Sequence, residues 1–279
     1  MSRQGLKNHL VYLCIINYKS ITMKKILFLL ITLLFIQFNL AQSDEPYILR
    51  FHYMSVSGDV NEYIEANKTY FKKLAEQGVK DQVWAGWEMH QSMSEANKFL
   101  FIHHFKSPKQ YENYRNVFSN DVAKKLGLKS PNWDSFQAEG KPYEFWQIVS
   151  YAFGKTSSKY FVKNEFKFTN AKKFVENNKL WGEMVINPQL ENNEGMNWAC
   201  GVRMMGNYWE DGNMMSFNGI SFDGFNSLES LMKGSAYTET PKPNKYFEKF
   251  AEESRKRELN DFASARQSSV WKVIDNTWN

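Results

Sequence analysis

Histidine is the residue type whose placement in this sequence most favours chemistry at neutral pH. Four of the five histidines lie in predicted β-strands between residues 47 and 106: His52, His90, His103 and His104. An imidazole titrates near neutral pH, so it can act as a general acid or base, and its neutral form can bind a metal ion. The same side chains could instead be ordinary strand residues satisfied by tyrosines and backbone groups.

The first two predicted strands place charged side chains beside these histidines. Side chains alternate across a strand, so residues two positions apart share a face. By this rule Arg50 lies beside His52, and Glu88 lies beside His90 on the same face as Trp84. Each strand therefore combines an imidazole with a group that could hold an anion or orient the ring.

The third predicted strand, residues 98–106, carries two histidines on opposite faces. His103 falls with phenylalanines, whereas His104 falls with Leu100 and Ile102. The aliphatic face favours contact with a helix, so we expect His103 to face the site, although a shift of one residue would reverse the assignment. The sequence thus predicts one cavity, lined by Arg50, His52, Glu88, His90 and His103.

Such a cavity suits acid–base chemistry on a small molecule, with Arg50 holding an anionic group and Glu88 orienting an imidazole. The candidate catalytic residues are His103, His90 and His52. The candidate ligand-binding residues are Arg50, Glu88, Trp84 and Tyr151. Histidines beside a carboxylate could also hold a divalent metal, but no short ligand spacing is present, so we predict no metal and no cofactor.

The predicted strands belong to a pattern that occurs twice: strand, helix, strand, strand, helix, strand. In the first half it covers residues 47–56, 60–78, 82–91, 98–106, 107–118 and 143–153. In the second half it covers residues 160–168, 171–192, 196–205, 214–222, 227–233 and 270–274, with an extra helix at 244–267. Trp84-Ala85 and Trp198-Ala199 begin the second strand of each half, as a duplicated unit requires.

This element order is the ferredoxin-like pattern, and its duplication resembles the dimeric α/β-barrel superfamily, which includes antibiotic-biosynthesis-monooxygenase-like proteins. The resemblance covers nearly all of residues 47–279 and implies two ferredoxin-like βαββαβ repeats that pair within one chain into an α/β barrel. In the haem-dependent families of this group the iron ligand is a histidine of the C-terminal repeat. Here no histidine follows His104, which argues against that function.

The charge of the chain is concentrated at its N-terminus. Residues 1–41 contain basic side chains and no acidic ones, whereas residues 42–279 carry 30 of each sign. A neutral body argues against binding to nucleic acid or to an anionic membrane surface. Lys24 and Lys25, the apolar run Ile26–Ile36 and the small Ala41 form a pattern typical of a secretory signal peptide. The run is too short for a spanning helix.

We therefore expect four segments: a start-site artefact at 1–22, a signal peptide at 23–41, a first repeat at 42–155 and a second repeat at 156–279. Cys200 is the one cysteine of the body, so no disulfide is possible within it, and a small core thiol is favoured over a nucleophile. The expected product is a periplasmic or secreted protein without stable membrane insertion.

Function is left open among three classes. The leading hypothesis is a protein that binds a small molecule between two sheet faces. The alternatives are a cofactor-independent enzyme of the oxygenase or isomerase kind, and a structural or interaction module whose sheet faces are filled by aromatic side chains.

Overall fold

The computed structural model describes residues 47–112, 114, 117–154, 157–191, 197–206, 209–210, 213–214, 217–235, 245–259 and 263–277. The predicted signal peptide, residues 23–41, and the preceding segment lie outside the described residues. Among the described helices, none combines the length and the apolar character that a bilayer span demands.

The first half of the chain contains five strands and a group of outer helices. The strands are β1 (Tyr47–Gly58), β2 (Gly86–Ser92), β3 (Lys98–Phe105), β4 (Phe136–Gly140) and β5 (Glu144–Ala152). The helical segments are α2 (Val60–Ala66), η1 (Asn67–Phe71), α3 (Lys72–Lys80), α4 (Pro108–Glu112) and α5 (Asn120–Lys125). The Asp59 side chain caps α2 by accepting from the backbone N–H groups of Asn61 and Glu62.

The second half contains a similar succession of elements. Its strands are β6 (Tyr160–Phe168), β7 (Asn197–Gly206), β8 (Trp209–Glu210), β9 (Asn213–Met214), β10 (Gly219–Phe225) and β11 (Ala263–Asn276). Its helical segments are α6 (Ala171–Trp181), η2 (Gly182–Ile186), α7 (Asn187–Glu191), α8 (Leu228–Ser235) and α9 (Lys245–Lys256).

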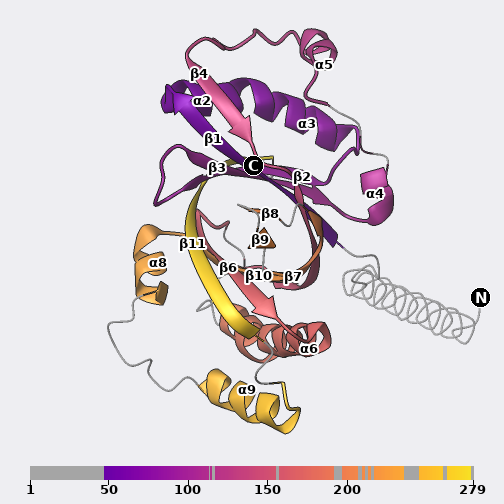
Figure 1. The fold of residues 1–279 in the computed structure, drawn as a ribbon, viewed down its shortest axis with the longest axis vertical. Helices are drawn as coiled ribbons and strands as arrows, with labels where there is room; N and C mark the ends of the chain where they lie inside the picture. The colour runs from indigo at the N-terminus through magenta and orange to yellow at the C-terminus, as the bar shows by residue number, and fades with distance from the viewer. Residues whose placement is uncertain are drawn as a thin grey trace, which may run out of the picture. The chain divides into compact units, whose positions relative to one another are not determined.

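Eight strands close into one antiparallel barrel. Around the barrel the order is β1, β3, β2, β11, β6, β10, β7 and β5, and β5 pairs again with β1. The long strand β11 joins the two halves of the chain on one side, because it pairs with both β6 and β2. On the other side β5 pairs with both β1 and β7. Figure 1 shows this ring of strands with α2, α3 and α6 outside it.

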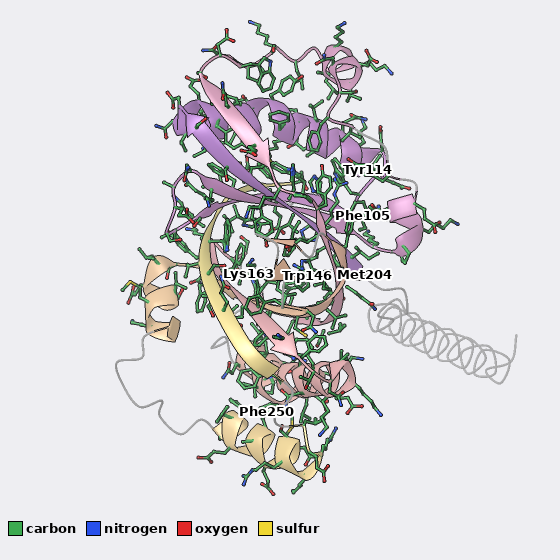
Figure 2. All side chains as sticks on the ribbon, viewed as in Figure 1. Phe105, Tyr114, Trp146, Lys163, Met204 and Phe250 are labelled. Atoms are coloured by element: carbon green, nitrogen blue, oxygen red, sulfur yellow. The ribbon has the colours of Figure 1, made fainter. Side chains whose placement is uncertain are left out.

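The strands β1 and β3 carry buried side chains on both faces. On the outer face, residues such as Ile48 and Phe99 pack with Tyr63 and Ala75 of the α2–α3 segment. The inner face carries a separate cluster of Leu49, Phe51, Leu100, Ile102, Trp146, Phe161, Ile220 and Trp271. In Figure 2, Trp146 and Lys163 lie within the ring of strands, whereas Phe105 and Tyr114 lie outside it, toward α3 and α4.

Three elements differ from the sequence prediction. Of the helix expected at 107–118, the described residues form α4, and Tyr114 and Val117 lie outside it. The loop before β5 contains the additional strand β4, which pairs with the end of β1. The helix expected at 244–267 ends at Lys256, and β11 already begins at Ala263. The first part of β11 is polar and shows no alternation of apolar and polar residues. Ser268 and Ser269 of this part pair with Asn164 and Lys163 of β6.

Candidate functional site

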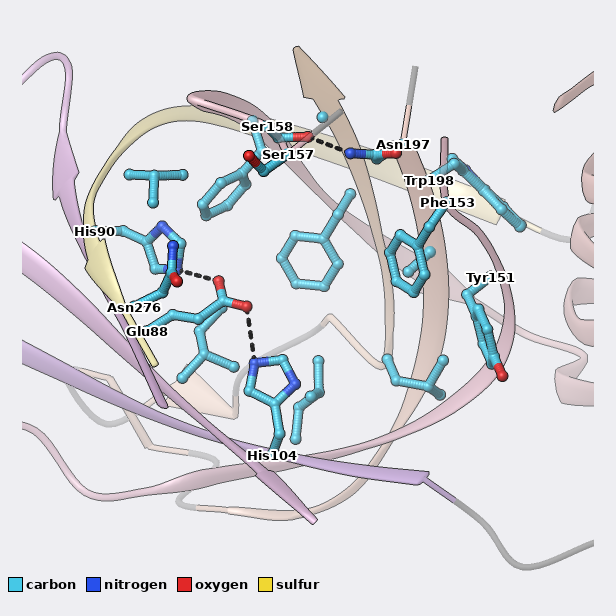
Figure 3. A pocket seen from close by; sticks show the side chains of 18 of the residues that line it. Glu88, His90, His104, Tyr151, Phe153, Ser157, Ser158, Asn197, Trp198 and Asn276 are labelled. Carbon is cyan, nitrogen blue, oxygen red and sulfur yellow. Dashed lines mark hydrogen bonds and ion pairs between the residues drawn. The ribbon is translucent and has the colours of Figure 1, made fainter. Parts of the chain in front are cut away.

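A cavity of about 590 Å³ lies inside the barrel. It is located where β1 and β6 begin, since Tyr47 and Leu49 of β1 and Phe161 of β6 line it. Much of its wall is apolar, with Ile102, Ile148, Phe153, Trp198, Phe222 and Val273 contributing. Figure 3 shows this pocket from close by, with its charged groups on one side and its aromatic mouth on the other.

The polar side of the pocket is built around the Glu88 carboxylate. His90 Nε2 lies 2.8 Å from Glu88 Oε2, and His104 Nε2 lies 3.0 Å from Glu88 Oε1. On the far side of its ring, His104 Nδ1 lies 3.0 Å from the Tyr47 hydroxyl. These contacts form one continuous chain, Tyr47–His104–Glu88–His90, along the cavity wall. Figure 3 shows the part from His104 through Glu88 to His90.

Glu88 is held in its ionised form by this arrangement. Burial acts to raise the pKa of the carboxyl, but the charge and hydrogen bonding of His104 and His90 outweigh it and hold the pKa well below its usual range. A carboxylate with a depressed pKa is a weak base. Glu88 is therefore suited to orient the two imidazoles and to stabilise their protonated forms, while the imidazoles can exchange protons with a ligand.

A β-bulge in β11 brings a further polar group to this side of the pocket. The register with β2 shifts between Val273 and Asp275, directly beside His90. Asp275 is anchored by Lys72 of α3 through an ion pair of 2.7 Å. Asn276, the next residue, lines the pocket.

The mouth of the pocket combines two aromatic rings with a polar rim. Tyr151 and Phe153 are 45% and 67% exposed, and their rings stack with centroids 5.3 Å apart. Beside them, Asn197 accepts a hydrogen bond from the Gly154 backbone N–H at 2.6 Å and donates one to the Ser158 hydroxyl at 2.9 Å. Gly154, Ser157 and Ser158 lie between β5 and β6, where the first half of the chain connects to the second, and all three line the pocket. Described residues of this connection therefore form part of the entrance.

The barrel interior away from the pocket is filled by a buried ionic network. Arg203 pairs with Glu144 at 2.7 Å, and the Trp146 ring N–H donates to the same carboxylate at 3.2 Å. Lys163 pairs with Glu165 at 3.0 Å and donates to the Tyr53 hydroxyl at 2.8 Å. These paired groups occupy the inner face farther along β1, β5 and β6.

The structure brings together three of the residues predicted for the site and separates the others. Glu88, His90 and Tyr151 line the pocket. The prediction of a single shared cavity is wrong for Arg50, His52 and His103, which do not line the pocket. Trp84, a candidate ligand-binding residue, does not line it either. Arg50 and His103 are cross-strand partners under the outer helices and loops, and His52 lies against Tyr143. The catalytic and ligand-binding roles assigned to all these residues remain untested.

The error arises from the third strand, where both faces are buried. Phe99 and Phe101 belong to the outer core, while Leu100 and Ile102 belong to the inner one, so hydrophobicity does not distinguish the two faces. The aliphatic face points into the barrel and carries His104 with it.

His104 and Tyr47 are the main site residues that the sequence prediction missed. The pairing of β1 with β3 could have identified both residues. It places Leu49 opposite His104, and Tyr47 lies two residues before Leu49, on the same face of β1. That signal requires the register between strands, which alternation within one strand does not supply.

Trp84 is fixed beneath α3, away from the pocket. Its ring N–H donates to the Ala75 carbonyl at 3.0 Å, and a Cβ atom at Gly78 would lie 2.7 Å from the indole ring.

We expect Gly78→Ala to lower the free energy of unfolding. The clash with the indole ring costs about 1–3 kcal/mol, and the better helix propensity of alanine offsets about 1 kcal/mol of this. Urea denaturation measures the change. Trp84→Phe should relieve the strain in the Gly78→Ala background, and a more stable Gly78→Ala variant would contradict the clash.

The described part of the chain contains no group of three or more His, Cys, Asp or Glu side chains arranged to hold a metal ion. Cys200 is buried, and burial raises the pKa of its thiol, so it is a core residue, as the sequence favoured. Sequence positions after His104 offer no histidine that could ligate a haem iron.

Comparison with known proteins gives structural likenesses only. No protein-family model and no curated protein matches the chain. A candidate monooxygenase from Lactobacillus acidophilus matches with a TM-score of 0.48 at 10% identity, over 83% of this chain and 96% of the other. An anthrone oxidase-like protein matches with a TM-score of 0.47 at 12% identity, over 84% and 93%.

A variant of chlorite dismutase from Candidatus Nitrospira defluvii matches with a TM-score of 0.42 at 9% identity, over 84% of this chain and 94% of the other. Likenesses at this level carry no argument about activity. The structure itself shows a mixed α+β fold, in which an antiparallel barrel closes within one chain and helices lie outside it.

Proposed function

We propose that the protein binds a neutral, mainly apolar small molecule inside the barrel. The observation that carries this proposal is the character of the cavity, about 590 Å³ in volume. No lysine or arginine is present among its described lining residues, and its ionised carboxylate is Glu88. An anionic ligand would meet the Glu88 carboxylate there and no lysine or arginine among the described lining residues, whereas an apolar molecule would contact aliphatic and aromatic side chains.

The volume of the cavity is sufficient for a drug-sized ligand. Pockets of roughly 300–1,000 Å³ accommodate drug-sized molecules and bury most of their surface. The stacked rings of Tyr151 and Phe153 at the mouth favour a flat or aromatic ligand that passes between apolar walls. A structural module whose interior is filled by aromatic side chains would not require such a space.

A second candidate function is acid–base catalysis on the bound molecule, without a cofactor. The chain of contacts from Tyr47 through His104 and Glu88 to His90 favours it, because this chain borders the cavity. An imidazole could take a proton from the ligand, and the Glu88 carboxylate would stabilise the imidazolium that forms. Such proton transfer is the first step expected of an isomerase-type or oxygenase-type reaction.

Duplication and export belong to the same proposal. We take residues 42–155 and 156–279 as two ferredoxin-like repeats, which the parallel succession of elements and the Trp-Ala pairs at Trp84 and Trp198 support. The predicted signal peptide at 23–41 would export the protein to the periplasm or the medium.

Binding of N-phenyl-1-naphthylamine, a neutral fluorescent probe, tests the proposal. We expect saturable binding at least tenfold tighter than that of its sulfonated, anionic analogue 1-anilinonaphthalene-8-sulfonate. Ile148→Trp should weaken binding of the neutral probe at least tenfold, because the indole would occupy cavity volume. Met93→Trp adds the same ring at an exposed position and serves as the matched control. Equal affinity for the two probes, or an unchanged Ile148→Trp variant, would refute an apolar binding pocket.

The two candidate functions are separated by His104→Ala and His90→Ala. An enzyme would lose turnover of a screened substrate while retaining the neutral probe. A binding protein would show no turnover to lose. Probe binding that is unaffected by these changes and by Ile148→Trp would place the ligand elsewhere.

A further inference from the structure

Arg50 is a buried cation on the outer side of the barrel, away from the proposed pocket. It is 4% exposed and lies in β1 opposite His103 of β3. Its guanidinium carbon lies 4.4 Å from the centroid of the Tyr114 ring and 4.5 Å from that of Tyr143. The side chain is therefore stacked on aromatic rings, an arrangement that leaves its in-plane N–H donors to find other partners.

No carboxylate in the described part of the chain pairs with Arg50, and its buried Nε has no hydrogen-bond partner there. Two further buried cations among the described residues provide a direct comparison. Arg203 stacks on Trp146 at 4.8 Å and also pairs with Glu144 at 2.7 Å. Lys163 lies over Tyr53 at 4.9 Å and also pairs with Glu165 at 3.0 Å. Arg50 has the aromatic partners without the anion, and an uncompensated buried charge is costly.

Two histidines, His52 and His103, lie beside this cation, and their rings are neutral at neutral pH. Burial, and then the Arg50 charge, lower the pKa of His103 well below its usual range and that of His52 to about 4. The His52 ring lies 4.6 Å from the Tyr143 ring, which is 41% exposed, so this side of the cluster approaches the surface. An anion seated beside Arg50 would offset its charge and could accept hydrogen bonds from the histidines.

We infer that Arg50 and His52 form a binding site for a small oxyanion, a carboxylate or a phosphate group, at the Tyr143 side of β1. The inference does not depend on the proposed function, because none of these residues lines the pocket. The guanidinium edge would hold two oxygens of the anion, and His52 would donate to it in its protonated form.

The experiment follows the His52 ring signals by NMR during pH titration of the protein, in chloride and then in phosphate or acetate at equal ionic strength. We expect a saturable rise of the His52 pKa of at least one unit with phosphate, acetate or both. A stronger response to phosphate assigns the site to phosphorylated ligands, and a stronger response to acetate assigns it to carboxylates. If neither anion moves the pKa beyond its value in chloride, the site does not exist.

Arg50→Gln tests the role of the guanidinium, and we expect it to reduce the anion response at least tenfold in apparent affinity. Arg50→Lys retains the charge but loses the planar edge, so it should bind more weakly than the parent protein. Lys68→Gln removes an exposed cation that pairs with Glu65, and it should leave the response unchanged. An Arg50→Gln variant that responds like the parent protein overturns the inference. If Arg50→Gln does not fold, the titration of the unaltered protein still decides.

Discussion

Arg203→Met is expected to lower the free energy of unfolding by about 3–5 kcal/mol, because it leaves the Glu144 carboxylate buried without its cation. The side chains of Arg203 and Glu144 are 1% and 8% exposed, so water does not replace the lost partner. Burying an unpaired ionised carboxylate is among the most destabilising changes a single substitution can make. Urea denaturation at neutral pH measures the change.

The double variant Arg203→Met, Glu144→Gln should recover much of this loss. The glutamine removes the unpaired charge and retains an oxygen that can accept from the Trp146 ring N–H. Lys233→Met provides the matched control, because it breaks the exposed Lys233–Glu229 pair and should change the stability little. Equal losses for Arg203→Met and Lys233→Met would show that the network inside the barrel is open to water.

Glu88→Gln is expected to lower stability by about 1.5–3 kcal/mol, since it replaces a carboxylate that contacts two imidazoles with a neutral amide. The loss should depend on pH. The folded-state pKa of Glu88 is depressed, so its stabilising contribution is fully present above the ordinary pKa of 4.5 and is lost as the pH falls through the folded-state value. The difference in stability between parent and variant should therefore shrink in acid.

Denaturation curves recorded between about pH 6 and pH 3 test this dependence. Glu95→Gln is a suitable control, because Glu95 forms an exposed pair with Lys98 and should show little change across the series. A difference between parent and Glu88→Gln that stays constant or grows toward low pH would mean that the carboxyl is not held ionised by His90 and His104.

Much of the architecture could be predicted from the order of elements. The strand 160–168 and the long helical segment from Val60 to Lys80 follow clear alternation and helical spacing, and both are present in the structure. The boundary between α9 and β11 could not be predicted, because the polar start of β11 is stabilised by pairing with β6 and not by its own pattern. Pairing of this kind is a tertiary effect.

The candidate site was predicted only in part, for a reason that lies in the barrel itself. Strands buried on both faces lose the contrast between apolar and polar sides, so His103 and His104 could not be assigned to a face from β3 alone. Glu88 and His90 were assigned correctly to the inner face. The residues that complete the site, Tyr47 and Asn276, come from strand ends whose register only the closed sheet defines.

The seam closed by β11 also has a consequence for biosynthesis. During translation the residues from Tyr47 to Phe225 can pair with one another, but the ring stays open until Ala263–Asn276 has left the ribosome. The same terminal stretch supplies Val273 and Asn276 to the pocket wall. The pocket wall is therefore incomplete until this last strand has paired, and the ligand binding proposed above would require the closed barrel.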